Sequence, residues 1–492
     1  MRPVLGVRGE TKLRAAADAV ALTGGGLLAT LLAIEAARRY GFTGLAAPLA
    51  VGVAILLLRW PALVVLGTVA LAVLFEGPDF GLLPATDNLY RDLAGGVMPI
   101  DLLFALGVVA TALQLLRRRL PVLLPPPPLS LAVALILIAL AGGAIVARPA
   151  GVSPTTALLA SHTIVYVALL PVLIVNLYLT GRQIKLALVG VAVLAIVKAV
   201  LGLAVIATGR GFAVEGSTLT YYTPTGNWVP MVVALVVVAA LLLRVRPRLP
   251  LWLLAGTPLL LASLTLSYRR SFWIGFALAL LTLIPLGLRP PTRRLILPIA
   301  VLLGVAVWVL GSAALQADTM VAQRLQSLSI SRLESNPQDR YRLDERANVV
   351  GELRDHPITG LGLEVPWQAT ERPLPVEVNP SHSYVHFAVL YWWLKLGLLG
   401  LVAFVTTMAS GIWLSWRIFR RGREPVIRAV GLGSACAILG LLAIESTATF
   451  TGVDFRFTIA FAAQLGLLAV LYRRATTAAP GTGGPPVAGG SA

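Results

Sequence analysis

The stretch LSLAVALILIALAGGAIV, residues Leu129 to Val146, decides the fold class of this chain. It holds 18 residues without one charged side chain, and about 20 apolar residues in an α-helix span the hydrocarbon core of a bilayer. The run is continuous rather than alternating, so it predicts a membrane helix and not a strand of a membrane β-barrel. Similar runs recur along the 492 residues, of which 57% are hydrophobic and 13% charged. This composition excludes a soluble protein.

We expect about 12 to 14 transmembrane helices, which makes the chain an all-α, polytopic membrane protein. The expected helices begin near Ala17, Thr43, Pro61, Ile100, Leu129, Ala160, Lys185, Trp228, Leu251, Ser271, Leu295, Tyr384, Arg428 and Gly452. The run that follows Tyr384 is longer than one crossing needs.

The net charge of +18 is distributed unevenly between the two sides of the predicted bundle. If the N-terminus is cytoplasmic and the helices alternate, most arginine clusters fall in the cytoplasm, as the positive-inside rule expects. These clusters are Arg117 to Arg119, Arg244/Arg246/Arg248, Arg289/Arg293/Arg294, Arg417/Arg420/Arg421/Arg423/Arg428 and Arg473/Arg474. We therefore attribute the basic charge to membrane topology and expect no nucleic-acid partner.

Composition divides the chain into five parts. Residues 1–16 form a cytoplasmic N-terminus, residues 17–314 transmembrane helices with short loops, and residues 384–474 the C-terminal transmembrane helices. The tail 475–492 is rich in Gly, Pro, Ala and Thr, and we expect it to be disordered in the cytoplasm. Residues 315–383 are polar and hold 10 of the 22 acidic residues. The helix alternation makes this segment a large extracytoplasmic loop, and long loops are commonly functional.

Rare polar side chains gather on the predicted outer face of the membrane. They are Arg269, Arg270, Arg342, Arg346, His356, His382 and His386. Arginine suits phosphate because its planar guanidinium donates two parallel hydrogen bonds. Histidine titrates near neutral pH and suits proton abstraction. Together these groups can hold a lipid-linked diphosphate and deprotonate an attacking hydroxyl.

Several of these residues also have a structural alternative. His382 could cap the helix that follows it, and Arg269 and Arg270 could reach lipid headgroups. His382 and His386 have the i, i+4 spacing of a zinc pair, but a third and a fourth ligand are not evident in the sequence. We expect no metal and no cofactor, because arginines can carry the charge of a departing diphosphate.

Three motifs in this order resemble the O-antigen ligase and O-antigen polymerase superfamily of membrane proteins. SYRRSFW (Ser267 to Trp273) is similar to its Ser-x-x-Arg-x-x-Trp turn and points to Arg270. RLDERANVVGELRDHPITGLGL (Arg342 to Leu363) is similar to its arginine-rich helix, which ends in His-Pro-x-x-Gly-x-Gly. HSYVHFAVLYWWLKLGLLGL (His382 to Leu401) is similar to its His-Asn-x-Tyr segment, with Ser383 in place of the asparagine.

The resemblance implies a glycosyltransferase with an all-helical, GT-C-like membrane fold in the bacterial cytoplasmic membrane. Such proteins move a glycan from undecaprenyl diphosphate to a hydroxyl of a glycan, lipid or protein acceptor, with inversion at the anomeric carbon. The implied roles are diphosphate binding by Arg270, with Arg269, and by Arg342 or Arg346, and proton abstraction by a histidine. The local sequence favours His382 and the spacing to Gly397 favours His386; we expect His382.

A transporter of a small anionic solute is the competing hypothesis. Transporters place their charged groups near the membrane midplane on broken helices. Lys198 is the strong candidate at that depth, whereas the Arg and His set lies at the outer face. This placement favours the enzyme.

Overall fold

A computed structural model gives the fold. It describes residues 57–75, 96–209, 223–245, 249–267, 269–288, 337–376 and 381–477, together with residue 52 and the segments 89–90, 212–214 and 218–220. The chain forms two compact units, Met1–Thr68 with Asp101–Val122, and Val69–Ile100 with Leu123–Ala492. The predicted N-terminus 1–16 lies outside the described residues, as does the tail beyond residue 477.

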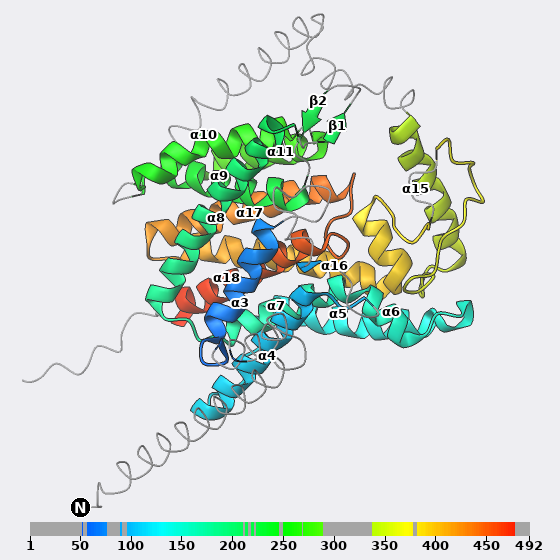
Figure 1. Ribbon diagram of the computed structural model, residues 1–492, viewed down its shortest axis with the longest axis horizontal. Coiled ribbons are helices and arrows are strands. Elements are labelled where there is room, and N and C mark those ends of the chain that lie inside the picture. The colour runs from blue at the N-terminus through cyan, green and yellow to red at the C-terminus, as the bar shows by residue number, and fades with distance from the viewer. Residues whose placement is uncertain are drawn as a thin grey trace, which may run out of the picture. The chain divides into compact units, whose positions relative to one another are not determined.

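The described residues are predominantly helical (Figure 1). The helices are α3 (Pro61–Leu74), α4 (Pro99–Arg118), α5 (Pro127–Val146), η3 (Arg148–Ala150), α6 (Pro154–Ala160), α7 (His162–Val175), α8 (Gly181–Ala207), α9 (Pro224–Leu242), α10 (Leu251–Leu266), α11 (Arg270–Gly287), α15 (Pro337–Asp355), α16 (Ala388–Arg421), α17 (Pro425–Glu445) and α18 (Phe455–Thr477). Two three-residue strands, β1 (Phe212–Val214) and β2 (Thr218–Thr220), form one antiparallel hairpin in the described part of the chain.

Eight of the described helices are long and apolar enough to cross a membrane: α4, α5, α8, α9, α11, α16, α17 and α18. Three shorter apolar helices are α3, α7 and α10. Each of these begins within four residues of a start expected from the sequence. The prediction of an all-α, polytopic membrane protein is confirmed. The expected helices near Ala17, Thr43 and Leu295 lie outside the described residues, so the total of 12 to 14 stays a prediction.

Helix starts follow from proline and from capping side chains. Proline opens α5, α6 and α9, where its missing N–H and fixed φ suit the first helical position. Thr180 and Gln183 form a reciprocal capping box at the start of α8. In the first unit, α4 buries Phe104 and places Gly107 against Val65 of α3.

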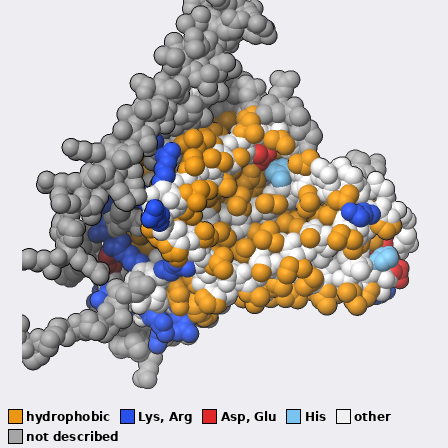
Figure 2. All heavy atoms as spheres, turned by 90° about the horizontal axis from the view of Figure 1, so that it is seen from below, with side chains coloured by type: hydrophobic (Ala, Val, Ile, Leu, Met, Phe, Trp, Pro, Cys, Tyr) orange, Lys and Arg blue, Asp and Glu red, His pale blue; other side chains and the backbone are white. Residues whose placement is uncertain are grey.

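The second unit is a bundle in which helices from distant parts of the chain pack side by side. α16 packs on α5 and α17, α18 on α7, and α17 on α9 and α11. The turn of residues 422–424 reverses the chain between α16 and α17, and after the loop of residues 446–454 α18 packs on α16. On the face drawn in Figure 2, hydrophobic side chains form a broad band, and most Lys and Arg side chains lie together at one side of it. This distribution is that of a membrane bundle with one basic end.

An interruption inside α16 explains why the run after Tyr384 is longer than one crossing. Gly397 has φ 69° and ψ −167° within this 34-residue helix, a conformation that favours glycine. The helical bond from Leu398 to Leu394 is replaced by two bonds to another segment: Leu398 N–H donates to Ile358 O at 2.9 Å, and Leu361 N–H donates to Leu394 O at 2.7 Å. The His-Pro-x-x-Gly-x-Gly segment is therefore hydrogen-bonded into the break of α16.

Candidate functional site

The turn between α10 and α11 sets the position of Arg270. The Ser267 hydroxyl and the Trp273 indole N–H both donate to the carbonyl of Leu264, at 2.7 and 3.2 Å. These two bonds explain the Ser-x-x-Arg-x-x-Trp spacing, because serine and tryptophan close the turn on either side of the arginine. Arg270 is the first residue of α11 and extends from this turn toward α15.

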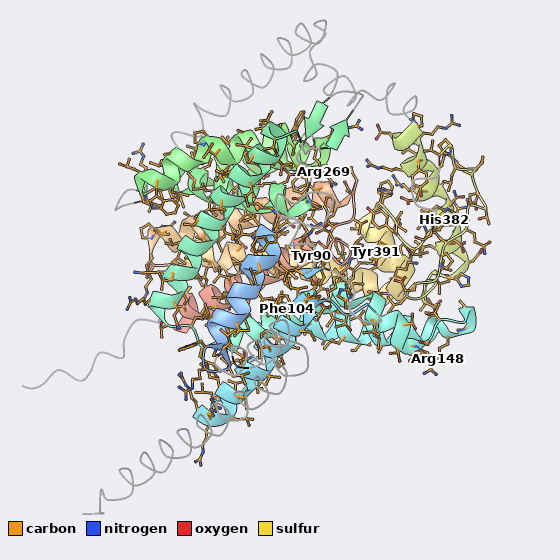
Figure 3. All side chains as sticks on the ribbon, in the orientation of Figure 1. Tyr90, Phe104, Arg148, Arg269, His382 and Tyr391 are labelled. Atoms are coloured by element: carbon orange, nitrogen blue, oxygen red, sulfur yellow. The ribbon has the colours of Figure 1, made fainter. Side chains whose placement is uncertain are left out.

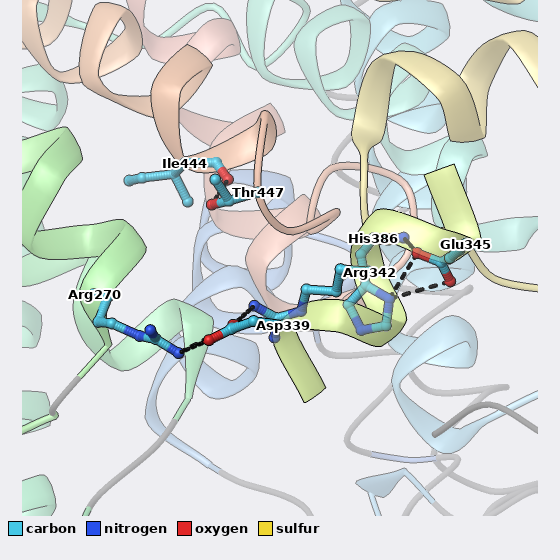
Figure 4. Close-up of polar contacts among 7 residues, drawn as sticks. All are labelled: Arg270, Asp339, Arg342, Glu345, His386, Ile444 and Thr447. Atoms are coloured by element: carbon cyan, nitrogen blue, oxygen red, sulfur yellow. Dashed lines mark hydrogen bonds and ion pairs between the residues drawn. The ribbon is translucent and has the colours of Figure 1, made fainter. Parts of the chain in front are cut away.

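One face of α15 carries the acidic partners of the site. Asp339, Arg342 and Glu345 follow one another at intervals of three residues, which places them near one side of the helix. Arg270 Nη2 binds Asp339 Oδ2 at 2.9 Å and Oδ1 at 3.1 Å. Arg342 Nη1 lies 3.8 Å from the same carboxylate. Figure 4 shows the two guanidinium groups meeting Asp339 from different elements. Two cations thus share one carboxylate.

His386 binds Glu345 on the same face of α15. Its Nδ1 lies 2.9 Å from Glu345 Oε2 and 3.2 Å from Oε1, and its backbone N–H donates to Oε2 at 2.9 Å. The Glu345 side chain is fully buried and that of His386 is 12% exposed. Because a carboxylate only accepts, Nδ1 carries the proton and Nε2 is the basic nitrogen of the neutral ring. The rings of Tyr341 and Tyr384 contact the imidazole edge-on.

His382 lies in a different environment. Its ring stacks on Trp367, with centroids 4.3 Å apart, and its Nδ1 donates to Trp367 O at 3.1 Å. Its φ is +48°, an uncommon backbone conformation for a residue other than glycine. In Figure 3 His382 lies apart from Arg269. The structure therefore brings His386, rather than His382, onto the face of α15 that carries Arg342.

Arg269 and Tyr384 extend the site toward the loop between α17 and α18. The Arg269 guanidinium carbon lies 4.8 Å from the centroid of the Phe450 ring. Glu445 holds that loop by accepting from the N–H groups of Phe450 and Thr451, at 3.1 and 2.9 Å. Burial raises the pKa of the Tyr384 phenol, and the charge of Glu345 adds to this effect. The phenol therefore remains a protonated donor beside Arg269 and Arg342.

The other predicted residues lie at the margin of this site. Arg346, one helical turn after Arg342, holds its guanidinium carbon 5.7 Å from the centroid of the Phe387 ring. His356 is exposed just after the end of α15. Within the described part of the chain, no three His, Cys, Asp or Glu side chains are grouped as metal ligands.

The sequence indicated Arg270, Arg342 and His386 as candidates, although it favoured His382 over His386, and it did not indicate the acidic partners Asp339 and Glu345. Asp339 and Glu345 stand three residues before and three residues after Arg342, and that spacing was the available signal. Nothing in the spacing indicates that Glu345 pairs with a histidine 41 residues further on.

Comparison with known families agrees with the three motifs. Residues 255–405 match the family described as O-antigen ligase. The matched range contains the turn at Ser267, the α15 helix and both candidate histidines. No curated protein matches the chain. The family match over residues 255–405 supports the resemblance of this chain to the superfamily of O-antigen ligases and polymerases.

Proposed function

We propose that this protein transfers a glycan from undecaprenyl diphosphate to an acceptor hydroxyl at the outer face of the bacterial cytoplasmic membrane. One observation carries the proposal: Arg270, Arg342 and His386 converge on one face of α15 through Asp339 and Glu345. The family match supports glycosyl transfer in general, and this constellation supplies the groups that a diphosphate donor requires.

Arg270 and Arg342 are assigned to the diphosphate. Their two positive charges share the single charge of Asp339, so the trio keeps a net positive charge. Bidentate guanidinium contacts orient phosphate oxygens and neutralise the charge that develops on the leaving group. Arg269 and the protonated Tyr384 phenol are further donors on the same side. Asp339 holds both arginines in place before the substrate arrives, which lowers the cost of ordering them.

His386 is assigned as the general base, with Glu345 as its positioning residue. The acceptor oxygen bonds to the anomeric carbon while the bond from that carbon to the diphosphate oxygen breaks. The acceptor proton passes to Nε2 of His386, and undecaprenyl diphosphate leaves with the electron pair. Glu345 fixes the tautomer and stabilises the imidazolium that forms. A single displacement of this kind inverts the anomeric centre.

The test is glycan transfer by the purified protein in detergent, with a synthetic undecaprenyl diphosphate oligosaccharide, an acceptor and EDTA. We expect release of undecaprenyl diphosphate together with a longer or relocated glycan. A longer chain on the lipid identifies a polymerase, and a glycan moved to another acceptor identifies a ligase. Absence of turnover, together with substrate-dependent flux of an anion into liposomes, would contradict the proposal and identify a transporter.

A further inference from the structure

A groove at the basic end of the second unit lies between the start of α8 and the end of α18. It has a volume of about 470 Å³ and is lined by Gly181, Arg182, Lys185, Leu186, Val189 and Arg474. Three of these six residues are cations and none is acidic. The groove takes no part in the glycan transfer proposed above, because the two sites lie at opposite ends of α18. Phe455, at the start of this helix, follows the loop of the candidate site, and Arg474 lies near its other end.

Among the described residues, no acidic side chain pairs with the three cations of the groove. In the part of the chain that the structure describes, Arg182, Lys185 and Arg474 take part in none of the ion pairs. Like charges gathered around one cavity repel each other, and an anion that enters the cavity relieves this repulsion. The arrangement therefore has the electrostatics of an anion site.

Neighbouring contacts hold the two walls of the groove in place. The capping box of Thr180 and Gln183 fixes the start of α8. On the other wall, a hydrogen bond from the Arg473 guanidinium to Leu124 O ties the end of α18 to the proline-rich segment before α5. Gly181 lets the Arg474 guanidinium approach, because a Cβ at this position would lie 2.5 Å from Arg474 Nη1. A side chain at residue 181 would therefore require the end of the Arg474 side chain to shift.

Beyond the groove, α8 presents an exposed apolar stripe. Leu186, Val189, Val193 and Val197 are 60%, 49%, 45% and 40% exposed. Their spacing of three or four residues places them along one side of the helix. A ligand that joins a phosphate head to hydrocarbon chains matches both parts, the cationic groove and the apolar stripe.

We propose that this groove binds the phosphate headgroup of an anionic phospholipid, with the acyl chains along the exposed stripe of α8. The positive-inside rule places this end of the bundle in the cytoplasm, so the lipid comes from the inner leaflet. Basic pockets between transmembrane helices on that side are known to hold anionic headgroups. The site is separate from the outer-face donor site, and it stands whether or not the proposed transfer reaction is correct.

The test is native mass spectrometry of the detergent-purified full chain after addition of phosphatidylglycerol or phosphatidylcholine. We expect selective retention of phosphatidylglycerol, and about tenfold weaker retention by the triple variant Arg182→Gln/Lys185→Gln/Arg474→Gln. The matched control Arg420→Gln/Arg421→Gln/Arg423→Gln removes the same charge from exposed positions outside the groove and retains the lipid. Equal loss of lipid in both triple variants would overturn the proposal.

Two further measurements separate the groove from a general charge effect and from soluble phosphate. Gly181→Ala keeps every charge and only shifts the end of the flexible Arg474 side chain, so we expect it to weaken phosphatidylglycerol retention less than the triple variant does; a loss as large as that of the triple variant would contradict a site held by charge. Inorganic phosphate at the concentration of the lipid should not displace it. Displacement would identify a site for free phosphate and overturn the lipid assignment.

Discussion

At the scale of single residues, two arginines contact the same carboxylate in the candidate site. Arg270 reaches Asp339 at 2.9 Å, and Arg342 lies 3.8 Å from it. Asp339 thus holds the two guanidinium groups next to each other, so that one diphosphate can contact both. The guanidinium planes, rather than positive charge alone, carry the proposed recognition.

Arg270→Lys and Arg342→Lys test this recognition. A lysine keeps the charge and loses the bidentate geometry, so we expect kcat/KM for the lipid-linked donor to fall roughly 10- to 100-fold in either variant. Arg346→Lys is the matched control on the same helix, and its transfer rate should stay near that of the wild type. A drop of the same size in Arg346→Lys would assign the diphosphate to the next turn of α15.

Glu345→Gln tests the positioning of His386. The amide retains an acceptor for Nδ1–H but loses the negative charge that stabilises the imidazolium, so we expect kcat to fall about 100-fold with little change in KM. Glu345→Asp should restore part of the rate and shift the pH–rate profile relative to Glu345→Gln. If the pH–rate profile is unchanged in both variants, Glu345 has a structural role and does not position the base.

The sequence predicted the two arginines of the candidate site, favoured His382 over His386, and did not predict the acidic residues Asp339 and Glu345. Arg270 lies in a motif with a fixed turn, and Arg342 lies on a predicted helix. Asp339 and Glu345 read as two among the acidic residues of a polar loop. Their partners, Arg270 and His386, are 69 and 41 residues away in sequence, and local spacing does not encode such distances.

At the scale of elements, the interrupted helix α16 determines where the segment before it can lie. The segment of residues 358–361 occupies the break at Gly397 through two backbone hydrogen bonds. Further along, Trp367 N–H donates to His382 O at 3.1 Å, and Thr449 Oγ1 donates to Val385 O at 2.6 Å. These bonds hold the polypeptide between α15 and α16 so that His386 reaches Glu345.

Gly397→Ala tests the break. A Cβ at Gly397 would meet the backbone carbonyls of Ile358 and Thr359, and φ of +69° is unfavourable for alanine. We expect a loss of stability of about 2 kcal/mol or more, measured as a lower Tm in detergent. Gly190→Ala in α8 is the control, because no atom lies within 4 Å of a Cβ there. Its Tm should be unchanged or higher. An equal Tm for both variants would contradict the role of the break.

Helix positions followed from the sequence because continuous apolar runs, prolines and caps are local signals. The only sign of the break in α16 in the sequence is an apolar run that is too long for one membrane crossing. Its location depends on hydrogen bonds with residues 358–361, which are close in space but not in the chain. The helix begins at Ala388, after the segment that carries His386 and four residues beyond the start expected at Tyr384.

At the scale of the whole molecule, charge distribution predicts the orientation in the membrane. The basic ends of α16 and α18 should face the cytoplasm, and α15 with the candidate site should face outward. The single cysteine, Cys436, is buried, so we expect the wild-type chain to react little with a thiol-labelling reagent.

Cysteine accessibility tests this orientation. Thr370 is exposed in the segment between α15 and α16, and Arg423 is exposed after the basic end of α16, so each can be replaced by cysteine for labelling. In intact spheroplasts a membrane-impermeant maleimide should label Thr370→Cys and not Arg423→Cys, and lysis should make both reactive. The reverse pattern would place the site in the cytoplasm and remove the proposed access to an outer-face donor.

The most direct measurement compares two neighbouring histidines in one assay. Transfer from a synthetic undecaprenyl diphosphate oligosaccharide is followed for His386→Ala and His382→Ala, with Tm recorded for both proteins. The Glu345 pairing predicts a loss of about 100-fold or more in kcat for His386→Ala and substantial activity for His382→Ala. Full activity of a folded His386→Ala protein would contradict the central claim, and loss confined to His382→Ala would move the base to the ring stacked on Trp367.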